Sequence, residues 1–188
     1  IWLTLEATGT AAHGSRPSLG VNAVDRLWDA IESVRTELAG RPLDVASEVV
    51  PVVDESIEFY AREMGEATAR RLFEYPSVNL GVLRGGNAIN AVPESATARL
   101  DVRATASVRT DALLSRIEET VAAHEGVEIA SASTANGTYQ ALDDPVVAAT
   151  VAAASAVADG RIYRRSATGG GDAKKLRLNG TPTAEFAF

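Results

Sequence analysis

The segment Ala12-His13-Gly14-Ser15-Arg16-Pro17-Ser18-Leu19-Gly20-Val21-Asn22 joins a strand-like stretch to a helix-like one and fixes the order of the first two elements. Its glycines and its proline permit a tight, irregular backbone. One of the two histidines of the chain lies in this segment, where core packing does not require it. Elements on both sides hold the loop, so the histidine can be presented to a ligand. The simpler alternative is a surface histidine in a connecting loop.

The residues on either side of this segment follow two different periods. Before it, over residues 1–8, apolar and polar residues alternate, which is typical of a strand with one buried face. After it, Asn22 is suited to cap a helix, and Gly40 and Pro42 are suited to end one. Between these signals, apolar residues recur with helical spacing at Val24, Leu27, Trp28, Ile31, Val34 and Leu38.

Further patterns complete a fold over residues 1–133. Alternating stretches around 78–82 and 96–102 predict two more strands. Thr110 is predicted to cap a second helix, and a fourth strand is predicted from Val127. The order strand, helix, strand, strand, helix, strand predicts an α+β, ferredoxin-like βαββαβ domain, in which two helices cover one face of a four-stranded antiparallel sheet.

Two regions lie outside this pattern. We interpret residues 41–76 as a helical insertion, with a helix from about Asp54 to Tyr75 that is interrupted at Gly65. Residues 138–188 contain an alanine-rich helix, a glycine-rich stretch and a strand-like end at 185–188, but too little apolar surface for a core of their own. We therefore interpret 138–188 as an incomplete C-terminal piece of an α/β domain. Strand-like residues at both ends predict that the chain is a piece of a longer protein.

Composition narrows the range of partners. The net charge of −7 disfavours nucleic acid and anionic membranes. No apolar run approaches the roughly 20 residues that span a bilayer. The absence of cysteine excludes disulfides and thiolate metal sites and favours a reducing, cytoplasmic location. We therefore expect small-molecule or protein partners.

Two polar residues and a glycine triplet are further candidates for a binding site. Asn90 follows a Gly-Gly turn, and Arg103 lies on the polar face of the next predicted strand. A guanidinium and a nearby amide suit recognition of a carboxylate, although each residue alone is also an ordinary surface residue. The triplet at 169–171 fits neither phosphate-loop pattern. It is either a flexible turn or a backbone that a substrate can approach closely.

A metal site cannot be assembled from the residues present. The two histidines, His13 and His124, are far apart in the sequence and belong to no His-Glu-x-x-His motif. Zinc sites need three or four ligands on rigid elements. His124 is instead expected at the C-terminal end of a helix, where the dipole favours an imidazolium.

Several stretches in this order resemble the lid, or dimerisation, domain of a family of zinc-dependent amidohydrolases. That family includes acetylornithine deacetylase, succinyl-diaminopimelate desuccinylase, aminoacylase and glutamate carboxypeptidase. The stretches are Ala12-His13-Gly14-Ser15-Arg16-Pro17 with Gly20-Val21-Asn22-Ala23, Asn79-Leu80-Gly81-Val82, Gly85-Gly86 through Asn90-Ala91-Val92-Pro93, and Leu100-Asp101-Val102-Arg103. Thr168-Gly169-Gly170-Gly171-Asp172-Ala173 resembles the glycine loop near the end of the same family's catalytic domain.

The resemblance implies a role for each matching residue. His13 would reach across a homodimer into the partner's active site, polarise the scissile carbonyl of a small N-acyl amino acid and stabilise the oxyanion. Asn90 and Arg103 would contact the substrate, with Arg103 holding its carboxylate. Gly170 and Gly171 would line the site from the catalytic domain. In the family, two zinc ions and a glutamate base carry out the hydrolysis.

The resemblance also implies what this chain lacks. In the family, the zinc ligands and the base come from segments before and after the part matched here. We therefore expect this chain to bind no catalytic zinc and to be inactive alone, although the intact protein is expected to be an amidohydrolase. The alternative is a non-catalytic ferredoxin-like module that dimerises or binds a small ligand, since such folds host many functions.

Overall fold

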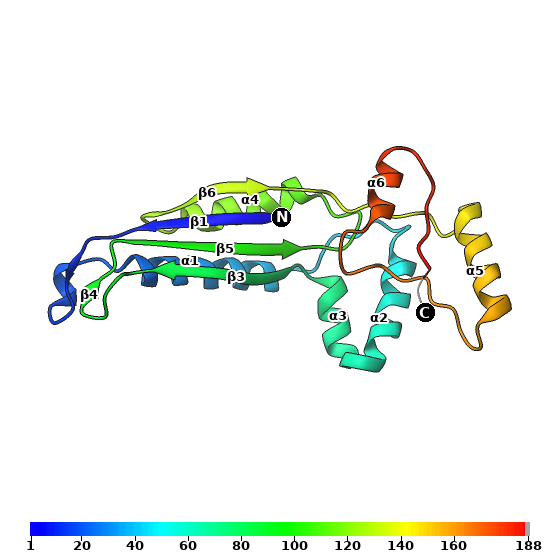
Figure 1. Ribbon diagram of the computed structural model, residues 1–188, viewed down its shortest axis with the longest axis horizontal. Helices are drawn as coiled ribbons and strands as arrows, with labels where there is room; N and C mark the ends of the chain where they lie inside the picture. Colours follow the sequence, from blue (N-terminus) through cyan, green and yellow to red (C-terminus); the bar gives the residue numbers. More distant parts are fainter. Residues whose placement is uncertain (187–188) are drawn as a thin grey trace. The chain divides into compact units, whose positions relative to one another are not determined.

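Four strands form one antiparallel sheet in the computed structural model, which describes residues 1–186 of the chain (Figure 1). Their spatial order is β3-β5-β1-β6. Their bounds are Trp2–Thr8 (β1), Ser77–Gly85 (β3), Ser95–Arg103 (β5) and Val127–Ser133 (β6). All three neighbouring pairs are antiparallel. This arrangement, with the helices described next, confirms the predicted ferredoxin-like α+β domain.

Helices α1 (Ala23–Ala39) and α4 (Thr110–Ala122) pack on one face of this sheet (Figure 1). On β1 and β5, these apolar positions of the predicted alternation point into the core and are buried: Leu3, Leu5, Ala7, Ala96, Ala98, Leu100 and Val102. Glu6 and Arg99, on the other face of the same strands, are exposed. Removal of this apolar face from water is the main force that holds helices and sheet together.

Helix α1 begins where the sequence predicts. The side-chain oxygen of Asn22 accepts hydrogen bonds from the backbone N–H groups of Val24 at 2.9 Å and Asp25 at 3.4 Å. One member of the predicted apolar stripe is placed differently: Trp28 is 44% exposed, and the Arg35 guanidinium lies over its ring at 5.9 Å. The small residues Ala23 and Ala30 take part in the buried face instead.

The predicted cap of the second helix is wrong by one residue. Thr110 is already the first residue of α4, and Arg109 occupies the N-cap position. Asp111, in the first turn, accepts a hydrogen bond from the Ala112 N–H at 2.9 Å. The Arg109 side chain hydrogen-bonds the same carboxylate and lowers the pKa of Asp111 to about 2. A charged carboxylate there stabilises the helix N-terminus.

The expected helical insertion consists of two helices, α2 (Val50–Met64) and α3 (Glu66–Glu74). The predicted break at Gly65 is present, and its φ of +83° is one that glycine adopts readily. The first helix begins at Val50, four residues before the predicted Asp54. Those extra residues belong to the helix because Val53 packs into a small apolar core. That core consists of Val49, Val53, Ile57, Ala69 and Phe73.

The described chain divides into two compact units. The first comprises 1–42, 76–103 and 109–135, and the second comprises 43–75, 104–108 and the residues from 136 onward. Residues 43–75, which the sequence places within the first domain as an insertion, thus group with the C-terminal part. The second unit also contains α5 (Pro145–Val157) and α6 (Asp172–Leu178).

The C-terminal end differs from its prediction where the structure describes it. Glu185 and Phe186 form no strand, and residues 187–188 of the predicted strand lie outside the described residues. A strand needs a neighbour for its backbone groups, and all the described strands belong to the first unit. Within residues 1–186, none of the helices combines the length and the apolar composition that a membrane crossing requires.

Candidate functional site

The sequence predicts a loop around His13, but part of this segment is a strand. Ala12 and His13 form a short strand, β2, which pairs in antiparallel fashion with β4 (Ala91–Val92). His13 lies opposite Ala91, the residue after Asn90. Two candidates that are far apart in the sequence, His13 and Asn90, are thereby brought together beyond one end of the sheet.

Gly14 makes this approach possible. Its backbone N–H donates a hydrogen bond to the Asn90 carbonyl oxygen at 2.7 Å. A Cβ atom at Gly14 would lie 2.9 Å from the carbonyl carbon and oxygen of Asn90. Real Cβ atoms do not come so close to backbone atoms, so only glycine fits without moving one of the two segments.

The His13 ring is exposed at this end of the sheet and is held from within its own segment. Its Nδ1 atom lies 2.7 Å from the Ser15 hydroxyl oxygen and 3.2 Å from the Ser15 backbone nitrogen. The Arg16 N–H donates to the His13 carbonyl oxygen at 2.8 Å, just before the 3-10 helix Pro17–Leu19. Both ring contacts use Nδ1, so Nε2 is available to another molecule. Asn90 is also exposed.

Arg103 lies at the opposite end of the same unit. It is the last residue of β5, whereas β4 and Asn90 precede the first residue of that strand, Ser95. The nine residues of β5 span about 27 Å at the usual rise of an antiparallel strand. Two hydrogen bonds join Arg103 to the Asp101 carboxylate, at 2.9 Å from Nε and 2.7 Å from Nη2. They raise the pKa of Arg103 and keep its guanidinium charged.

Gly170 and Gly171 lie in the second unit, directly before α6. A Cβ atom on Gly170 would meet no atom within 4 Å. A Cβ atom on Gly171 would lie 2.9 Å from a carboxylate oxygen of Glu185. That oxygen accepts a hydrogen bond from the Ala173 N–H at 3.2 Å. Gly171 therefore lets the Glu185 carboxylate reach the start of α6. At Gly170, by contrast, the space beside the backbone is empty.

The described residues do not build a metal site. No group of three or more His, Cys, Asp or Glu side chains that could hold a metal ion occurs in residues 1–186. A zinc site needs at least three such ligands on rigid elements. The donor set of this stretch of chain therefore does not fit a zinc ion by itself.

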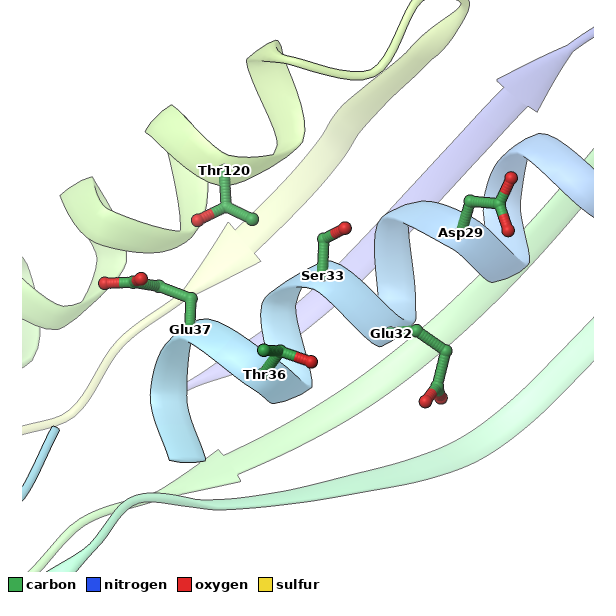
Figure 2. Close-up of a pocket in the computed structure, with 6 residues that line it drawn as sticks. All are labelled: Asp29, Glu32, Ser33, Thr36, Glu37 and Thr120. Atoms are coloured by element: carbon green, nitrogen blue, oxygen red, sulfur yellow. The ribbon is translucent and has the colours of Figure 1, made fainter. Parts of the chain in front are cut away.

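A depression of about 600 Å³ lies between α1 and α4, away from these candidates (Figure 2). Two of its acidic side chains are neutralised by arginine: Glu32 by Arg35 at 2.6 Å and Glu37 by Arg116 at 3.2 Å. The depression contains none of the predicted site residues. Its lining consists of Asp29, Glu32, Ser33, Thr36, Glu37 and Thr120.

The sequence alone does not single out Ser15. Its contact with His13 becomes visible only when the turn between them is formed. A serine two residues after a histidine, in a segment with glycine and proline, is nevertheless suited to a local hydrogen bond. The spacing of two residues between His13 and Ser15 is therefore the sequence signal that could have pointed to Ser15.

The chain is similar to known proteins, most clearly over its first two thirds. Residues 1–128 match the family model described as peptidase dimerisation domain. A probable succinyl-diaminopimelate desuccinylase from Staphylococcus epidermidis is 35% identical over 100 residues, which are 52% of this chain and 24% of that protein. A probable carboxypeptidase from Aspergillus clavatus is 35% identical over 106 residues, 56% of this chain and 21% of that protein. The chain thus spans about a quarter of the length of these relatives or less.

Solved structures share the fold. A tripeptidase from Staphylococcus aureus superposes with a TM-score of 0.64 at 18% identity, covering 96% of this chain and 41% of that one. An M20 family metallo-carboxypeptidase from Sulfolobus solfataricus gives 0.65 at 17% identity, covering 95% and 48%. At these identities the likeness establishes the architecture.

Proposed function

The chain belongs to the peptidase dimerisation domain family, and from this premise we propose that it is the lid, with part of the catalytic domain, of a zinc-dependent amide hydrolase. The proposed reaction is hydrolysis of a small N-acyl amino acid by a deacylase or carboxypeptidase in the cytoplasm. Residues 138–188 are proposed to be the C-terminal piece of the catalytic domain. The names of the desuccinylase and carboxypeptidase relatives support this class of substrate.

The separation of the candidate residues along the first unit supports a site shared by two subunits. His13 and Asn90 lie beyond one end of β5, and Arg103 lies at the other. The strand between them is about 27 Å long, which exceeds the length of a small N-acyl amino acid. One lid therefore cannot contact one substrate with both ends. In a homodimer, His13 and Asn90 of one subunit would join Arg103 of the other around a single substrate.

The chemistry of the exposed groups suits these roles. In the proposed complex, the His13 imidazole donates a hydrogen bond to the carbonyl oxygen of the scissile amide and stabilises the negative charge that develops there. Asn90 supplies an amide group beside it, and the Arg103 fork binds the substrate carboxylate. The Gly170 and Gly171 backbone lines the site. Zinc would be bound by side chains outside this chain, because the described residues do not fit it.

Mixing two inactive variants of the intact enzyme tests this proposal. His13→Ala and Arg103→Ala should each lower kcat/KM at least ~100-fold, the scale of losing one oxyanion donor or one charged anchor. In a heterodimer of the two variants, one site combines the intact His13 and the intact Arg103. Random pairing makes half of the dimers heterodimers with one intact site each, so the mixture should recover about a quarter of the wild-type activity.

The controls separate the alternatives. Each variant mixed with itself should stay inactive, and zinc content should equal that of the wild type. If the mixture stays inactive although mass spectrometry shows heterodimers, the two residues do not share a site between subunits. If both single variants keep full activity, the residues are not functional, and the non-catalytic dimerisation or ligand-binding module becomes the better account.

A further inference from the structure

We infer that Ser15 is a positioning residue that holds His13 in the tautomer with its proton on Nε2. The inference about the tautomer comes from this chain alone, and only its consequence for turnover rests on the proposed function. Ser15 itself touches no reacting atom. It decides whether the free nitrogen of His13 donates or accepts a hydrogen bond.

The two contacts between these residues identify the tautomer. A backbone N–H can only donate, and the Ser15 N–H faces His13 Nδ1 at 3.2 Å. This contact favours a lone pair on Nδ1, because a proton there would face the amide proton directly. The Ser15 hydroxyl, 2.7 Å from the same nitrogen, can rotate to donate as well. In the neutral ring the proton then lies on Nε2.

The backbone around Ser15 keeps this arrangement in place. Gly14 is joined to Asn90 by an N–H···O bond of 2.7 Å, and the Arg16 N–H is joined to the His13 carbonyl at 2.8 Å. Ser15 thus lies between two anchored residues, in a segment that is paired with β4. The serine is held against Nδ1 by hydrogen bonds that do not involve either side chain.

The tautomer has a chemical consequence. With the proton on Nε2, the exposed nitrogen of His13 is a donor, which is what a developing oxyanion requires. With the proton on Nδ1, the exposed nitrogen would present a lone pair and repel the oxyanion. In serine proteases, where a carboxylate orients the catalytic histidine, loss of the correct tautomer lowers kcat by about four orders of magnitude. At Ser15 the backbone N–H would survive substitution, so a smaller effect is expected.

Nitrogen NMR of the labelled chain tests the tautomer directly. At a pH where His13 is neutral, wild type should show an unprotonated Nδ1 and a protonated Nε2. Ser15→Ala keeps the backbone N–H but loses the hydroxyl, so both nitrogens should shift part of the way toward averaged values, and Ser15→Thr, which keeps the hydroxyl, should restore the wild-type pattern. Ser18→Ala, in the same segment, is the matched control and should leave the pattern unchanged. A proton on Nδ1 in wild type, or identical spectra for wild type and Ser15→Ala, would overturn the inference.

Kinetics of the intact enzyme separate this inference from the proposed function. Ser15→Ala should lower kcat about tenfold with little change in KM, and Ser18→Ala should change neither. If NMR shows the Nε2 proton but His13→Ala leaves turnover unchanged, the proposed function fails and the tautomer assignment stands. If His13→Ala abolishes turnover while Ser15→Ala alters neither the spectrum nor kcat, the positioning role of Ser15 fails and the proposed function stands.

Discussion

At the scale of single residues, Gly14 is a position beside the candidate site that admits only glycine without movement of its neighbours. Its N–H bonds to the Asn90 carbonyl, and the space where a Cβ atom would lie is already filled by the Asn90 backbone. Gly170 provides the contrast, because a Cβ atom there would meet nothing. The two glycines therefore serve different purposes, close approach in one case and an open backbone in the other.

We predict that Gly14→Ala destabilises the chain by about 1–3 kcal/mol, the usual penalty for forcing extra volume into a packed site. Urea unfolding followed by circular dichroism measures this difference. Gly170→Ala is the matched control and should leave the free energy of unfolding unchanged. In the intact enzyme, Gly14→Ala should also reduce activity, since it separates His13 from Asn90. If Gly14→Ala and Gly170→Ala are equally stable, the segments that contain Gly14 and Asn90 can move apart at no cost in stability.

From the sequence, individual candidate residues could be proposed, but their arrangement in space could not. His13 is distinctive because a glycine follows it directly in an irregular segment, and Asn90 is distinctive because it follows a Gly-Gly turn. That they are neighbours depends on the β2–β4 pairing between residues far apart in the chain, which no local pattern encodes. That Arg103 lies far from both follows only from the direction of β5. The roles of all three remain predictions that the experiments above test.

At the scale of secondary-structure elements, periodicity predicts the first unit well because each strand and helix there has one buried face. The Asn22 cap and the alternation of β5 both follow from local chemistry. Trp28 is the exception on α1: helical spacing predicts that it is buried, but Ala23 and Ala30 belong to the buried face and the Trp28 ring is exposed. The start of α2 was less predictable, because its apolar contacts come from α3.

A further contact, between helix α2 and the segment that contains Arg164, depends on charge. Glu55 of α2 accepts hydrogen bonds from the Arg164 backbone N–H and from its Nε, both at 2.8 Å. The Ser56 hydroxyl accepts a bond from the Ser166 N–H at 2.8 Å. Partial burial opposes ionisation of Glu55, but the bonds to Arg164 prevail and lower its pKa below the ordinary 4.5. Helix α2 thus holds the segment that precedes the glycine loop.

This lowered pKa predicts how the contact responds to acid. Because the folded-state pKa lies below 4.5, the contact stabilises the second unit fully above pH 4.5 and progressively less as pH falls through the folded-state pKa. The amide chemical shift of Arg164 should therefore titrate below pH 4.5. Glu55→Gln should abolish that titration, whereas Glu66→Gln, on α3, should preserve it. A midpoint above 4.5 for Arg164 would contradict the assigned contact.

At the scale of the whole chain, the sequence predicts the ferredoxin-like domain. It assigns residues 41–76 to that domain as an insertion because they lie between two of its elements along the chain. Contacts group the residues differently, since α2 and α3 share a core with each other and with Tyr139. The order of elements along the chain cannot show this grouping. The apolar face of a short helix does not reveal which other segment it will pack against. The two ends of the insertion nevertheless meet: the Leu43 N–H donates to the Glu74 carbonyl oxygen at 2.7 Å.

This closure predicts that the first unit folds without the insertion. Replacing residues 43–75 by a short Gly-Ser linker and ending the chain at residue 135 keeps every strand of the sheet together with α1 and α4. We expect one cooperative unfolding transition for the shortened chain, because α1 and α4 contact each other and the same sheet. Leu27→Ala in that core should lower the stability by about 2–5 kcal/mol, and Trp28→Ala, at the exposed position, by much less. A shortened chain that unfolds without a transition, or that responds equally to both substitutions, would mean that the sheet and its two helices do not form an independent folding unit.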